Sequence, residues 1–69
     1  MARVSHTSSN VDWTDYDEQV QKLTVRYHSG KTYTYDRVPA HKYENLMNAE
    51  SVGRHLNVHI IPNHPARKH

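Results

Sequence analysis

Apolar and polar residues alternate over the first half of the chain, a pattern that predicts β-strands. The first strand is expected over residues 10–16. Val11 and Trp13 share one face of this strand, whereas Tyr16 falls on the opposite parity. A bulge or turn is therefore expected near residues 14–15.

The next two strands form a hairpin over residues 23–35, and its loop decides which side chains face the core. A three-residue loop over 28–30 needs Gly30 in a left-handed position. The apolar face then consists of Leu23, Val25, Tyr33 and Tyr35. A two-residue turn at Ser29-Gly30 shifts the pairing by one residue, and both tyrosines then lie among Lys22, Arg26 and Arg37. The first frame separates apolar from polar residues better and is favoured, while the second displays a surface suited to stacking bases.

The second half of the chain shows helical spacing. Pro39 suits a first helical position, and an amphipathic helix is expected over residues 39–49. Ser51 is a suitable cap for a second helix. Apolar residues recur four apart along that helix at Val52, Leu56 and Ile60. Gly53 within it marks a close packing approach.

The order of these elements predicts a small α+β fold, a three-stranded antiparallel meander packed by two short C-terminal helices. We expect a loose polar arm over residues 1–9, one domain over 10–61 and a basic, histidine-rich tail over 62–69. The apolar fraction is 35% and phenylalanine is absent, so the core must draw on aliphatic residues, Trp13 and the five tyrosines.

Composition narrows the class of protein. The chain has no cysteine, which excludes disulfides and thiolate metal sites. The absence of a long apolar run predicts neither a signal peptide nor a membrane span, so a soluble, cytoplasmic protein is expected. The net charge is only +2, but four of the seven acids fall within residues 12–18 and none follows Glu50. The C-terminal third is therefore locally cationic.

An ordered set of short motifs resembles the KTSC family, a domain found at the C-terminus of some lysyl-tRNA synthetases and alone in bacteria and phages. The set includes a central Tyr33-x-Tyr35 pair and the closing Asn57, and it covers about residues 8–60. Its other members are Ser8-Ser9-Asn10-Val11, Tyr16-Asp17, Leu23-Thr24-Val25, Gly30-Lys31-Thr32, Val38-Pro39, Tyr43, Leu46, Ala49, Ser51 and Gly53. The resemblance implies RNA binding by a free-standing bacterial or phage domain. Two departures are His55-Leu56, where the family has aromatic residues, and Thr14-Asp15, where it has Ile-Gly.

Catalysis is not expected, because no glycine-rich phosphate loop or nucleophile motif is present. We expect a non-enzymatic binding module without a cofactor, and nucleic acid, RNA above all, is the favoured partner. The candidate nucleic-acid-binding residues are Arg26, Lys31, Tyr33, Tyr35, Arg54, Arg67 and Lys68. The tyrosines contribute in the displayed frame only, and otherwise binding depends on the cations.

Two alternatives remain open. A protein-interaction module, such as a phage protein that modulates a host protein, would use Trp13, Tyr16 and Arg26 as anchors. The free edge of the third strand also allows a homodimer. His55 and His59 lie four residues apart and form a weaker candidate for a metal site.

Overall fold

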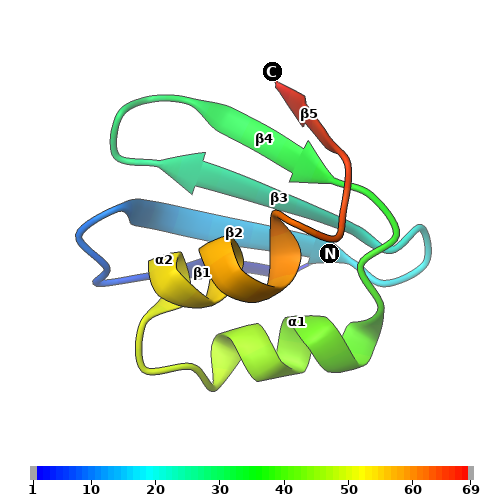
Figure 1. Cartoon of the computed structure of the whole chain (residues 1–69). Coiled ribbons are helices and arrows are strands. Elements are labelled where there is room, and N and C mark those ends of the chain that lie inside the picture. Colours follow the sequence, from blue (N-terminus) through cyan, green and yellow to red (C-terminus); the bar gives the residue numbers. More distant parts are fainter. Residues whose placement is uncertain (1, 69) are drawn as a thin grey trace.

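A twisted antiparallel sheet with helices on one face makes up the fold. In the computed structural model, which describes residues 2–68, five strands lie in the order β1-β2-β3-β4-β5 (Figure 1). The elements are β1 (Ala2–Ser5), β2 (Val11–Asp17), β3 (Lys22–Tyr27), β4 (Thr32–Tyr35), α1 (Ala40–Met47), α2 (Val52–His55), the π-helical turn η1 (Leu56–Ile60) and β5 (Ala66–Lys68). The predicted α+β class, with an antiparallel sheet and two helices, is confirmed.

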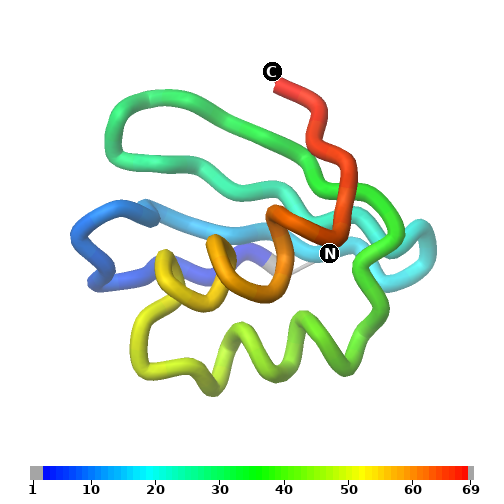
Figure 2. The backbone as a smooth tube through the Cα atoms, viewed as in Figure 1, coloured from blue at the N-terminus to red at the C-terminus, as the bar shows by residue number. Residues whose placement is uncertain are grey.

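The predicted number of three strands is wrong, because each end of the chain adds a strand. Val4 of β1 pairs with Thr14 of β2, and Arg67 of β5 pairs with Thr34 of β4. Figure 2 shows the last segment of the chain running beside β4. From the sequence we expect one edge of β4 to be free for a homodimer. In the described sheet this edge pairs with β5.

The hairpin adopts the favoured three-residue loop. Val25 pairs with Tyr33 and Leu23 with Tyr35. Gly30 has a φ of +93°, the left-handed conformation that this loop requires. The frame that displays both tyrosines among basic residues is therefore wrong, and the pair lies on the face that packs against the helices.

The bulge in β2 lies earlier than predicted. Val11 pairs with Tyr27 and Trp13 with Arg26, so Asp12 is the extra residue. Thr14 and Tyr16 consequently share the inner face with Val11, whereas Trp13 lies with Arg26 on the face away from the helices. This face is called the outer face below. Trp13 is therefore not part of the core.

Both helices contribute their predicted apolar residues. The Oγ of Ser51 accepts a hydrogen bond from the backbone N of Arg54 at 3.3 Å, which confirms the predicted cap. The buried hydrophobic core consists of Val11, Tyr16, Leu23, Val25, Tyr35, Val38, Leu46, Val52, Leu56 and Ile60. Within residues 2–68 no helix has the length and apolar character needed to cross a membrane.

Candidate functional site

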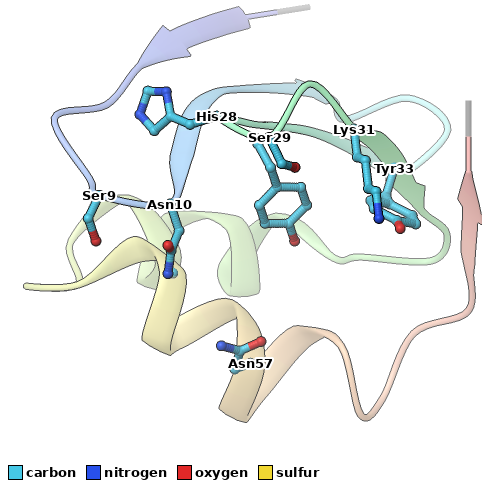
Figure 3. Close-up of a pocket in the computed structure, with 9 residues that line it drawn as sticks. Ser9, Asn10, His28, Ser29, Lys31, Tyr33 and Asn57 are labelled. Atoms are coloured by element: carbon cyan, nitrogen blue, oxygen red, sulfur yellow. The ribbon is translucent and has the colours of Figure 1, made fainter.

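A half-open pocket of about 420 Å³ lies where two loops of the sheet meet the second helix. The β1–β2 loop provides Ser9 and Asn10, and the helix provides Gly53 and Asn57. The β3–β4 hairpin provides the remaining lining residues, Tyr27, His28, Ser29, Lys31 and Tyr33. In Figure 3 Asn10 points toward the helix that carries Asn57, and Lys31 lies alongside Tyr33 at the other end. The nine described lining residues include no acid, so the pocket is suited to an anionic or polar ligand.

Local hydrogen bonds fix the two loops against each other. The Oγ of Ser8 accepts from the backbone N atoms of Asn10 at 3.2 Å and Val11 at 3.3 Å. The backbone N of His28 donates to the carbonyl of Asn10 at 2.9 Å. The His28 Nε2 lies 3.0 Å from the Ser8 carbonyl oxygen, to which it donates in the matching tautomer. The loops therefore hold the Ser9 and Asn10 side chains beside the hairpin.

The tyrosines form the aromatic wall of this pocket. The Tyr33 ring meets that of Tyr27 edge-on, with 5.8 Å between centroids, and lies 6.5 Å from that of Tyr35. Tyr35 is only 3% exposed, whereas Tyr27 and Tyr33 are half-buried and line the pocket. The hydroxyls of Tyr27 and Tyr35 are 2.9 Å apart. Burial is the main reason why the pKa of each of these two phenols is raised above its usual value of 10.

The predicted cations divide between surfaces. Lys31 lines the pocket, and Lys68 pairs with Tyr33 across the β4–β5 ladder and so shares its face. Arg67 lies on the outer face, with its Nε 3.4 Å from Oδ2 of Asp36. Two further cations lie away from the pocket, Arg26 on the outer face and Arg54 on the exposed helix surface. Only part of the predicted set is brought together.

The predicted protein-interface residues lie apart. The Tyr16 ring is 6% exposed and stacks on Tyr43, and its hydroxyl donates to the Val38 carbonyl at 2.6 Å. Tyr16 therefore offers no surface to a partner. Trp13 is half-buried on the outer face, where the guanidinium of Arg3 lies 3.9 Å from its ring centroid.

His55 and His59 lie side by side on the second helix, with ring centroids 4.4 Å apart. The pKa of His55 is lowered, first by burial and second by the charge of the neighbouring His59. Among the described residues no group of three or more histidine, cysteine or acidic side chains is placed to hold a metal ion. The pair therefore offers two imidazoles and no third ligand from the part of the chain that the structure describes.

The pocket gathers motif residues that the sequence places far apart. Ser9, Asn10, Lys31, Tyr33, Gly53 and Asn57 all belong to the set that carries the family resemblance. Only Lys31 and Tyr33 are candidates from the sequence alone. Most motif residues outside the pocket serve the core or a cap. Some polar motif residues, notably Asn10 and Asn57, have no such role. They are the feature of the sequence from which the pocket could have been predicted.

The fold and this pocket define a small single-domain α+β protein, and comparison with known proteins identifies its family. Residues 7–64 match the KTSC domain family. The chain belongs to this family. It is 39% identical over 64 residues to an uncharacterized protein of Stutzerimonas stutzeri. The aligned segment covers 93% of this chain and 90% of that protein.

A solved structure and a multidomain relative extend this comparison. The crystal structure of a KTSC domain protein from Yersinia pestis has a TM-score of 0.93 and 29% identity, over 99% of this chain and 96% of that one. A lysine–tRNA ligase of Nostoc punctiforme is 42% identical over 45 residues. That segment is 65% of this chain and 8% of the ligase. The domain thus occurs both as a small protein and within a larger one.

Proposed function

We propose that this protein is a non-enzymatic module that binds single-stranded nucleic acid, RNA above all, across the pocket beside the hairpin. The observation that carries this proposal is one wall with two half-buried tyrosine rings, Tyr27 and Tyr33, next to the ammonium of Lys31. Aromatic rings stack on unpaired bases, and lysines neutralise phosphates. A base–aromatic stack contributes about 1–3 kcal/mol.

The placement of the acidic residues supports this interface. Asp15 and Asp17 pair with Thr24 and Lys22 on the outer face, away from the pocket. The Oδ2 of Asp15 also lies 3.7 Å from the Nε of Arg3. The carboxylates of Asp15 and Asp17 therefore do not repel a phosphate chain that runs past the hairpin.

The role of His28 favours binding over catalysis. A general base needs a ring nitrogen that reaches the reacting group, usually with a second group that orients the ring. The Ser8 carbonyl contacts one nitrogen of the His28 ring, but among the described residues no hydrogen bond joins this ring to the hydroxyl of Ser9 or Ser29, so no nucleophile of the pocket is paired with it. We infer that the pocket positions a ligand and does not transform it.

The experiment is fluorescence anisotropy with labelled single-stranded RNA, duplex RNA and single-stranded DNA, at low salt and at about 200 mM salt. We expect single-stranded RNA to bind most tightly and affinity to fall steeply with salt. Lys31→Ala should weaken binding and reduce the log–log salt slope by about 0.7. Lys22→Ala removes the same charge from the outer face and is the matched control. Absence of binding at low salt would overturn the proposal.

The outer face favours a second candidate function, a protein-interaction module. Trp13 and Arg3 stack there on a sheet face that the helices leave uncovered (Figure 1). Tryptophan and arginine are the residues that most often anchor protein interfaces. A partner protein captured by the wild type and lost with Trp13→Ala, with RNA binding unchanged, would support this function.

A further inference from the structure

Two carboxamides in the pocket have no role in holding the fold. No hydrogen bond joins the side chain of Asn10 or Asn57 to another described residue, and both residues are exposed. By contrast, the side chains of Asn48 and Asn63 donate to backbone carbonyls of their own helical segments. The pocket asparagines therefore present free donors and acceptors.

A break in the regular helix positions Asn57. The second helix changes from α2 to the wider turn η1, closed by a bond of 2.8 Å from the backbone N of Ile61 to the carbonyl of Leu56. Such single π turns are rare and frequently occur at functional sites. Leu56 and Ile60 are fully buried on this turn, and Asn57 faces the hairpin (Figure 3).

Gly53 lets the second helix approach Asn10 closely at one end of the pocket. A Cβ built on Gly53 would lie 3.5 Å from Nδ2 of Asn10, which is ordinary contact distance. Because Gly53 does not have a positive φ, close packing and not backbone strain is the reason for a glycine at this position. The helix therefore lies directly against the Asn10 side chain at this end of the pocket.

We propose, on the basis of the function proposed above, that this pocket holds one unstacked purine base of a single strand. A purine offers a larger ring system than a pyrimidine for the aromatic wall of Tyr27 and Tyr33. Both purines also present N7 as an acceptor, which pyrimidines lack. Lysine ammonium and asparagine amide groups are the usual donors to this edge, and the pocket places Lys31, Asn10 and Asn57 around the aromatic wall.

The test is binding of four labelled pentaribonucleotides, UUAUU, UUGUU, UUCUU and UUUUU, by fluorescence anisotropy. We expect the two purine-containing strands to bind about tenfold more tightly than the two all-pyrimidine strands. Asn57→Ala and Asn10→Ala should each reduce this preference. Asn45→Ala, at an exposed position of α1 outside the pocket, is the matched control.

A second readout does not depend on mutation. In ¹⁵N-labelled protein, UUAUU should shift the side-chain amide signals of Asn10 and Asn57 but not that of Asn45. Equal affinity for all four strands, or preference for a pyrimidine, would overturn the purine site and leave nucleic-acid binding standing. Failure of every strand to bind at low salt would overturn both proposals.

Discussion

The five tyrosines differ in what their hydroxyl groups contact, and this difference separates structural from functional rings. The hydroxyl of Tyr16 donates to a backbone carbonyl, and that of Tyr35 contacts Tyr27. Buried tyrosines normally pair their hydroxyls in this way. No such bond to another described residue holds the hydroxyl of Tyr33, whose ring is half-buried at the pocket wall. Tyr33 is therefore the ring best placed to meet a ligand.

His64 joins the C-terminal segment to the rest of the fold. Its Nε2 accepts a hydrogen bond from the Nζ of Lys42 at 3.0 Å, because an ammonium can only donate. Its Nδ1 then donates to the Asp36 carbonyl at 3.1 Å. Burial, followed by the charge of Lys42, lowers the pKa of His64 below its usual 6.5. The folded state thus favours the neutral ring.

This arrangement predicts that acid weakens the fold. Because the folded pKa of His64 is lower than the unfolded value, its contribution to stability is complete above about pH 6.5 and declines as the pH falls. Urea unfolding should therefore show a lower free energy at pH 5 than at pH 7. We expect His64→Gln to reduce this difference, and His41→Gln, at an exposed position, to leave it unchanged. If the free energy of unfolding depended on pH equally in both variants, the assignment of this effect to His64 would be contradicted.

At the scale of elements, the two glycines have different reasons to be present. Gly30 occupies a left-handed conformation, and a Cβ added there would have no described atom within 4 Å. Gly53 is buried in a helix, where an added methyl group would contact Asn10. Backbone geometry is therefore the reason for the first glycine, and close packing against Asn10 is the reason for the second.

Gly30→Ala should lower the free energy of unfolding by about 1 kcal/mol, since alanine is strained at positive φ. Gly53→Ala should leave stability unchanged or raise it, because alanine favours the helix, but it should weaken ligand binding because the added methyl group packs against the Asn10 amide and limits its movement. Urea denaturation and RNA titration of both variants give the comparison. If Gly30→Ala lost RNA binding and Gly53→Ala kept it, the assignment of a structural role to Gly30 and a binding role to Gly53 would be contradicted.

Local signals account for the elements that the sequence predicts correctly. The loop ending in Gly30, the cap at Ser51 and the spacing of Val52, Leu56 and Ile60 each depend on neighbouring residues. The bulge at Asp12 depends instead on how β2 pairs with β3, which residue parity alone does not determine. The π turn likewise has no signature in the sequence. The pocket was missed because its walls come from three distant segments.

At the scale of the whole molecule, the terminal strands were missed for a related reason. Strands at a sheet edge pair on one side only, and both edge strands of this protein are short. β5 has three exposed residues without an apolar face, and β1 alternates over only four residues, the shortest run that indicates a strand. β5 is held by backbone pairing with β4, by the bond from the backbone N of Asp36 to the Pro65 carbonyl at 3.1 Å, and by the Arg67–Asp36 ion pair.

Removal of residues 66–69 should therefore expose the edge of β4. We expect a lower free energy of unfolding, faster hydrogen exchange at the β4 amides that face β5, and a tendency to self-associate. Urea denaturation, amide exchange and size-exclusion chromatography measure these effects. The variant Lys68→Ala keeps the strand and the Arg67–Asp36 ion pair, and it is the control for lost charge. Unchanged exchange in β4 after truncation would show that β5 adds no protection.

The strand order also determines how this domain would respond to mechanical force. The two ends of the chain lead into strands on opposite edges of the sheet, β1 and β5 (Figure 1). Tension between the ends therefore acts across the strands, parallel to the hydrogen bonds that join them. Each bond is then loaded in turn, as in a zipper. A domain pulled in this direction should open at low force, one edge strand at a time.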